Sequence, residues 1–114
     1  MKVLHYEKGL RYSDAQLVLL ARKLGRLATY CKKLQDASSA IRVEAMRRAT
    51  EKTRDRVKVM VTVELPRKLL RAESRRDDVM DAIDRCIEKL EPQIKRYKEL
   101  HTRKGYAQVR RRKD

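Results

Sequence analysis

Apolar residues recur at helical spacing in two segments of the chain. In the first, Ser13 is followed three residues later by Gln16, a combination typical of a capping box at a helix start. The apolar positions after it form one stripe: Leu17, Leu20, Ala21, Leu24, Leu27, Ala28 and Cys31. This pattern predicts an amphipathic helix over residues 13–31.

The second helical pattern opens on an acidic cluster, Asp77, Asp78, Asp81 and Asp84. Carboxylates favour the first turn of a helix because its free N–H groups carry partial positive charge. The apolar stripe that follows is Val79, Ile83, Cys86, Ile87, Leu90, Ile94 and Tyr97. Pro92 should kink or interrupt this helix because proline lacks a backbone N–H, and Gly105 is the expected stop.

Between the helical patterns, apolar residues fall at every second position. The alternation covers residues 41–45 and returns over residues 57–65, which predicts two half-buried strands. The intervening residues, 47–56, are rich in charge and lack apolar periodicity, as in a solvated hairpin loop. Pro66, Arg67 and Lys68 predict a turn into a third strand that carries Leu70 and Ala72.

Residues 3–6 are a short apolar segment that we interpret as an opening strand. The resulting order, β-α-β-β-β-α, predicts an α+β fold: a four-stranded, mostly antiparallel sheet with two helices packed on one face. We divide the chain into an α+β domain, residues 1–104, and a basic tail, residues 105–114, which we expect to be disordered.

Charge narrows the class of partner. The 114 residues include 31 Lys and Arg against 16 Asp and Glu, a formal net charge of +15 that attracts polyanions. The chain lacks the roughly 20 consecutive apolar residues of a membrane span and opens without an apolar run of signal-peptide length. We therefore expect a cytoplasmic protein that does not bind membranes.

Catalytic chemistry has little support. His5 and His101 lie in different elements, and no nucleophile elbow, phosphate-binding loop or zinc-protease motif is present, so we expect no enzyme, small-molecule substrate or cofactor. Asp77, Asp81 and Asp84 are spaced to share a helix face and form a metal site, but helix capping explains them more simply. Cys31 and Cys86 occupy apolar helix positions without CxxC spacing and predict buried free thiols.

The positions of the cations point to nucleic acid. If both helices pack on one sheet, their basic residues form one broad positive surface that suits phosphate groups. These candidate RNA-binding residues are Arg22, Lys23, Arg26, Arg85, Lys89, Lys95, Arg96, Lys98, Arg103 and Lys104. Tyr30 and Tyr97 lie on or beside the apolar stripes, where a core role is expected, which leaves Tyr106 in the tail as the candidate for base stacking.

Residues 70–100 resemble the fourth strand and second helix of the ribosome hibernation promoting factor and ribosome-associated inhibitor family, also called sigma-54 modulation proteins. The matching helix residues are Asp78, Ala82, Ile83, Asp84, Lys89, Leu90, Glu91, Gln93, Ile94, Tyr97 and Lys98. A looser match in the first half covers Ser13, Lys23, Leu24, Arg26, Leu27 and Tyr30. The chain departs from the family pattern at Asp14, Met80 and Pro92, where the family commonly has Pro, Tyr and a basic residue.

The resemblance implies a translation inhibitor of the stress response that contacts ribosomal RNA in the mRNA and tRNA channel of the small ribosomal subunit. It further implies the family's short form, without the C-terminal dimerisation domain, and we expect a monomer off the ribosome. Two alternatives stay open: a module for double-stranded or structured RNA, and an enzyme acting on RNA. A module for double-stranded RNA normally begins its second helix with lysines, where this chain has Asp77, Asp78 and Asp81. An enzyme acting on RNA would need a metal ion at the acidic cluster.

Overall fold

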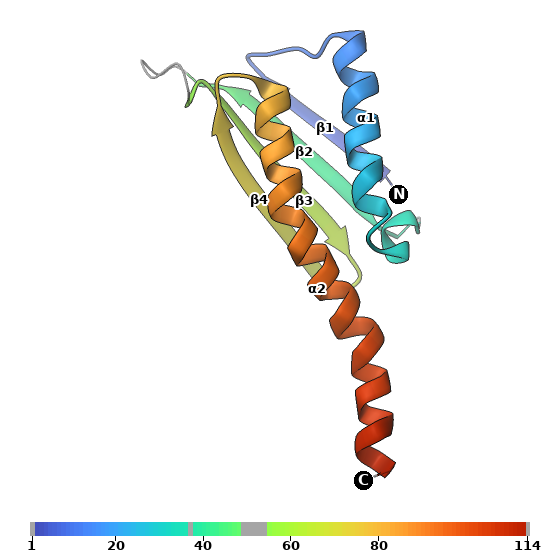
Figure 1. Cartoon of the computed structure of the whole chain (residues 1–114). Coiled ribbons are helices and arrows are strands. Elements are labelled where there is room, and N and C mark those ends of the chain that lie inside the picture. The colour runs from blue at the N-terminus through green and yellow to red at the C-terminus, as the bar shows by residue number, and fades with distance from the viewer. Residues whose placement is uncertain (1, 37, 49–54, 114) are drawn as a thin grey trace.

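The computed structural model describes residues 2–36, 38–48 and 55–113, with side chains up to Leu100. Its elements follow the predicted order and confirm the α+β class (Figure 1). They are β1 (Lys2–Lys8), α1 (Asp14–Ala28), the short 3₁₀ helix η1 (Lys32–Gln35), β2 (Ala40–Arg47), β3 (Val57–Leu65), β4 (Lys68–Arg76) and α2 (Val79–Lys113). Most of the loop expected at residues 47–56 lies outside the described residues.

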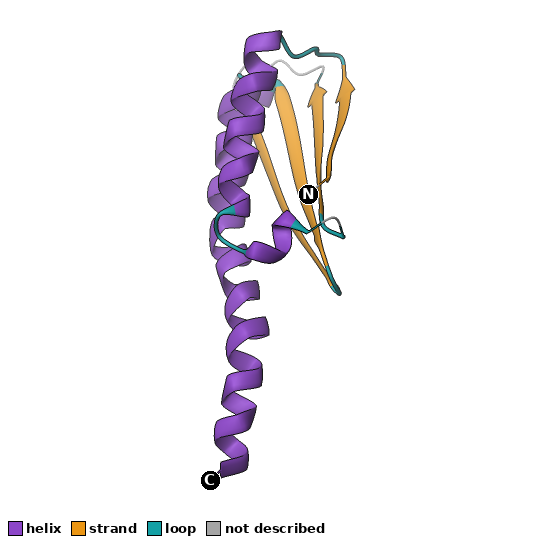
Figure 2. Cartoon of the chain, turned by 90° about the vertical axis from the view of Figure 1, so that its right-hand side faces the viewer, coloured by secondary structure: helices purple, strands orange, loops and turns teal. Residues whose placement is uncertain are grey.

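The four strands lie in the sheet in chain order, β1-β2-β3-β4. The pairs β2–β3 and β3–β4 are antiparallel, whereas β1 runs parallel to β2. A parallel neighbour needs a long crossover, which α1 and η1 supply. Both helices cover the same face of the sheet and leave the other face open (Figure 2), as predicted.

The predicted capping box opens α1. The Ser13 hydroxyl accepts a hydrogen bond from the backbone N–H of Gln16 at 3.1 Å, and the Gln16 side chain accepts one from the Ser13 N–H at 2.9 Å. The helix ends at Ala28, before the predicted Cys31, and its buried stripe is narrower than expected: Leu20, Leu24 and Leu27. Leu17 is 40% exposed and Ala21 is exposed, because α1 packs against the sheet on one narrow side.

Helix α2 is longer than its sequence signals predicted. It continues through Pro92, so the helix is not interrupted there, and through Gly105 to Lys113, so the predicted stop at Gly105 is wrong. Packing of the stripe on the sheet outweighs the hydrogen bond lost at Pro92, whose ring lies on the exposed side. The division into a domain and a basic tail stays a prediction.

The core lies between the sheet and the two helices. Val59, Val61 and Val63 of β3 are fully buried, as are Ile83 and Leu90 of α2. Each such side chain contributes roughly 1.5–3 kcal/mol through removal of apolar surface from water. Because these residues are the period-two and helical positions of the sequence, the alternation in β3 and the stripe of α2 meet face to face.

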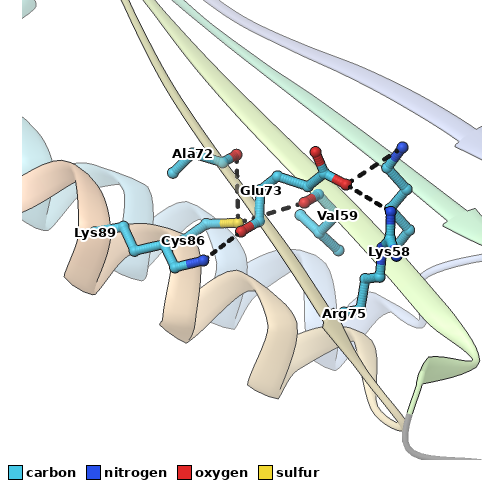
Figure 3. Close-up of polar contacts among 7 residues, drawn as sticks. All are labelled: Lys58, Val59, Ala72, Glu73, Arg75, Cys86 and Lys89. Atoms are coloured by element: carbon cyan, nitrogen blue, oxygen red, sulfur yellow. Dashed lines mark hydrogen bonds and ion pairs between the residues drawn. The ribbon is translucent and has the colours of Figure 1, made fainter.

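Both cysteines are buried free thiols, as predicted. The Cys86 sulfur lies under the sheet, 3.5 Å from the Val59 carbonyl oxygen and 3.7 Å from that of Ala72 (Figure 3). Burial raises the pKa of the Cys86 thiol to about 11, so the thiolate is scarce at neutral pH. Cys86 therefore serves as a small apolar core residue.

Helix α2 covers the outer edge of the sheet at β4. The Lys89 ammonium donates a hydrogen bond to the Glu73 carbonyl oxygen at 2.7 Å (Figure 3), and the Gln93 amide donates one to the Arg71 carbonyl oxygen at 3.2 Å. An edge strand presents unpaired backbone groups that invite further strands. The two side chains occupy two of these acceptors and so oppose strand addition at β4.

The position of Pro92 predicts that its replacement stabilises the protein. In Pro92→Ala the new N–H can bond to the Glu88 carbonyl, so the free energy of unfolding should rise by about 1–3 kcal/mol. Urea denaturation measures the change, with Glu99→Ala, at another exposed position of α2, as the control. An unchanged midpoint for Pro92→Ala would show that α2 has already compensated for the proline.

The contact at the sheet edge predicts a structural role for Lys89. Lys89→Met keeps the aliphatic stem and the helix propensity but removes the donor to Glu73, so unfolding should become easier by about 1 kcal/mol. The matched control is Lys98→Met, since Lys98 is exposed and its side chain has no hydrogen bond or ion pair within the described residues. Equal melting temperatures for the two variants would contradict this role.

Candidate nucleic-acid interface

Helices α1 and α2 lie side by side on the sheet (Figure 1), and an ion pair crosses the seam between them. The Lys23 ammonium is 2.5 Å from an Asp84 carboxylate oxygen, and the Lys23 side chain is only 22% exposed. Its charge is therefore matched within the fold. Lys23, one of the predicted RNA-binding residues, therefore links α1 to α2 within the fold.

A second cluster crosses the same seam further along α2. The Lys95 ammonium is 3.0 Å from a Glu91 carboxylate oxygen and lies 5.1 Å from the centroid of the Tyr30 ring of the chain after α1. The hydrogen bond from Lys95 lowers the pKa of Glu91, and the same bond raises the pKa of Lys95. Tyr30 thus serves as a platform for a lysine, and Lys95 is held in its charged form beside the seam.

Arg22, Arg26 and Lys98 are exposed and have no ion pair or hydrogen bond from their side chains within the described residues. Arg26 is close enough to Glu91 to lower its pKa, behind the larger effect of Lys95. Lys32 and Lys33, which sequence reasoning did not single out, are exposed directly after α1. We call this group the seam surface: Arg22, Lys23, Arg26, Lys32, Lys33, Lys95 and Lys98.

The other predicted cations of α2 leave the helix on the opposite flank, towards β4. Lys89 reaches the β4 backbone, and Arg85, one turn earlier, pairs with Glu88 at 3.0 Å. Arg96 lines a groove at the start of β4 together with Lys68, Gln93 and other residues. We call this group the edge surface: Lys68, Arg85, Lys89 and Arg96.

Carboxylates separate the two surfaces. Asp81, Glu88 and Glu99 are exposed and recur at intervals of seven and eleven residues, which places them in one line along the back of α2. The one broad positive surface expected from the sequence is therefore two narrower surfaces. Arg103 and Lys104 lie in α2, but their side chains are outside the described part of the chain.

The acidic cluster at the start of α2 has structural partners. One Asp78 carboxylate oxygen accepts hydrogen bonds from the backbone N–H groups of Met80 at 3.1 Å and Asp81 at 3.2 Å, which is helix capping. Asp84 is paired with Lys23. Within the described ranges, no three His, Cys, Asp or Glu side chains gather closely enough to hold a metal ion.

No helix in the part of the chain that the structure describes has both the length and the apolar character needed to cross a membrane.

The open face of the sheet carries polar residues that the sequence patterns did not assign to any site. Arg42, Lys58, Arg71 and Arg75 occupy the outward positions of β2, β3 and β4. Tyr6 lies on the same face and is 54% exposed. In the sequence these residues are only the polar half of an alternation, and Tyr6 looks like one more apolar residue of a short strand.

Comparison with known proteins agrees with this architecture. Residues 6–102 match the family model described as Sigma 54 modulation protein / S30EA ribosomal protein. A ribosome hibernation promotion factor from Staphylococcus aureus (strain COL) is 32% identical over 97 residues, which are 85% of this chain and 48% of the relative. The chain thus spans about half the length of that relative.

Two solved structures are similar to most of the chain. The N-terminal domain of Protein Y from Thermus thermophilus matches with a TM-score of 0.67 and 28% identity, covering 85% of this chain and 99% of that one. A ribosomal subunit interface protein from Coxiella burnetii matches with a TM-score of 0.67 and 26% identity, covering 86% and 98%. The family match extends over most of the chain, from β1 into α2, and the chain therefore belongs to the Sigma 54 modulation protein / S30EA ribosomal protein family.

Proposed function

We propose that the protein silences translation by occupying the mRNA and tRNA channel of the small ribosomal subunit. The observation that carries the proposal is the seam surface, where the side chains of Arg22, Arg26 and Lys98 make no ion pair or hydrogen bond among the described residues. The names of the relatives support a ribosomal partner, since one is a hibernation factor and another a subunit interface protein.

In the mechanism we propose, the protein blocks the mRNA and tRNA channel by binding in it and catalyses no reaction. Cations on helices positioned by a sheet can contact phosphate oxygens along a folded RNA without reading its bases. The Lys23–Asp84 ion pair links the two helices, and the contact of Lys95 with the Tyr30 ring links α2 to the segment after α1, so that the projecting cations keep fixed spacing. Fixed spacing favours an RNA whose phosphates match that spacing over random RNA. Binding then costs little side-chain entropy, because the cations are already ordered.

The start of α2 argues against a general module for double-stranded RNA. Asp78 and Asp81 lie at the first turn of α2, where phosphates would meet negative charge. We therefore assign ribosomal RNA as the ligand, with the protein acting as a monomer in the cytosol and without a cofactor. The side chains of Lys89 and Gln93 bond to two carbonyls of β4 and so oppose the pairing of a second chain there, which is consistent with a monomer.

Charge reversal on the two flanks of α2 separates the candidate surfaces. Arg22→Glu with Lys98→Glu alters the seam surface, and Lys68→Glu with Arg96→Glu makes the same change in charge at the edge surface. The seam variant should bind purified small subunits at least tenfold more weakly, equivalent to about 1.4 kcal/mol or more, and should lose inhibition in a cell-free translation system. The edge variant should lose much less.

Thermal melting verifies that both variants fold. The assignment is wrong if the edge variant loses binding and the seam variant does not. Random duplex RNA is the competitor, and equal affinity for duplex and for subunits would remove the ribosome as the specific partner.

Phosphate contacts also predict a steep dependence on salt. If about five phosphates are engaged, the logarithm of affinity should fall with the logarithm of salt concentration with a slope of about −4. The seam variant should show a slope shallower by about two, because two contacts are lost. Affinity that does not change between low and high salt would point to a ribosomal protein as the main contact.

A further inference from the structure

The open face of the sheet carries an aromatic ring that is more than half exposed. Tyr6 of β1 is 54% exposed on the side away from the helices. The strand register places Glu44 of β2 beside it and Lys8 two residues further along β1. The Arg42 guanidinium carbon is 5.9 Å from the centroid of the ring, so a cation already lies against it.

The charges of this face divide into paired and unpaired groups. Glu64 pairs with Arg42 at 3.0 Å, and Glu73 pairs with Lys58 and with Arg75, each at 3.4 Å. Glu44 and Lys8, by contrast, have no ion pair or hydrogen bond from their side chains among the described residues. The two unpaired charges therefore flank the exposed ring, one of each sign.

These residues line one groove. Its walls include Tyr6, Lys8, Glu44, Met46, Lys58 and Met60. The groove has a volume of about 190 Å³, below the roughly 300–1,000 Å³ of usual small-molecule pockets. An aromatic ring and methionine side chains give it an apolar surface, and the charged groups lie around that surface. A small flat ring with polar edges fits this chemistry.

We propose that the groove binds one nucleobase of a single-stranded RNA, stacked on Tyr6. Stacking on an aromatic ring accepts any base, and the nearby unpaired Lys8 supplies positive charge for a flanking phosphate. Glu44 adds a preference, because a carboxylate accepts hydrogen bonds and donates none. Guanine presents two adjacent N–H donors on its pairing edge, whereas uracil presents one donor between two carbonyls that the carboxylate repels.

The net charge of +15 favours RNA over a basic peptide as the occupant. The inference shares with the proposed function only the class of partner, RNA. The groove lies on the open face of the sheet. The seam surface belongs to the helices on the opposite face (Figure 2), so the two can be tested separately.

The test uses two five-nucleotide RNAs, UUGUU and UUUUU, each labelled for fluorescence anisotropy with the full chain. Tyr6→Leu should weaken binding of UUGUU about fivefold or more, since loss of one stacked base has at least that effect. Tyr6→Phe keeps the ring and should bind nearly normally. Glu44→Gln keeps the shape and should abolish the preference for UUGUU over UUUUU.

The seam variant, Arg22→Glu with Lys98→Glu, is the control for RNA held by the helices. Thermal melting verifies folding. The single variants Tyr6→Phe and Glu44→Gln keep the test decisive even if Tyr6→Leu is unstable. Unchanged binding in Tyr6→Leu, or an undiminished guanine preference in Glu44→Gln, overturns the inference. Oligonucleotide binding lost only in the seam variant also overturns it, while leaving the proposed function intact. If the Tyr6 and Glu44 variants change UUGUU binding but the seam variant binds subunits normally, the proposed function fails and this inference stands.

Discussion

Packing of two helical stripes against one face of a single sheet is the interaction on which the rest of the structure depends. Val59, Val61 and Val63 meet Ile83 and Leu90 with almost no exposed surface. This burial must outweigh chain entropy and the self-repulsion of a chain with net charge +15. Because the space between the sheet and the helices is filled by apolar side chains, the cations are left at the seam, along the β4 edge and on the open face.

Those cations do not all serve one purpose. Lys23 joins α1 to α2, Lys89 covers the β4 backbone, and Lys95 lies between Glu91 and Tyr30. Arg22 and Lys98, without such partners among the described residues, keep their full charge available to an external anion. The paired lysines order the scaffold, and the unpaired cations are the candidates for binding. A positive surface is therefore better judged by its unpaired charges than by its total number of basic residues.

The two faces of the sheet differ for the same reason. The helices conceal one face and reach round to β4, where Lys89 and Gln93 occupy backbone acceptors. The other face has no helix over it, so its side chains form ion pairs among themselves or remain in solvent. Tyr6 is left exposed there beside Glu44 and Lys8, and an aromatic ring between unpaired charges has different chemistry from the purely basic seam surface.

The sequence by itself determined the main elements, their order and most of the inward residues, because helical and alternating periods are local properties of the chain. The capping box at Ser13, the buried thiols and the α+β class follow from such patterns. Local signals failed at Pro92 and Gly105, where α2 continues as one helix despite both residues. Only the tertiary structure decided which cations contact other residues of the fold and which keep their charge available to an external anion. Spacing along a helix places a lysine on a face, but Glu73, Asp84 and Tyr30 come beside Lys89, Lys23 and Lys95 only when distant segments pack together.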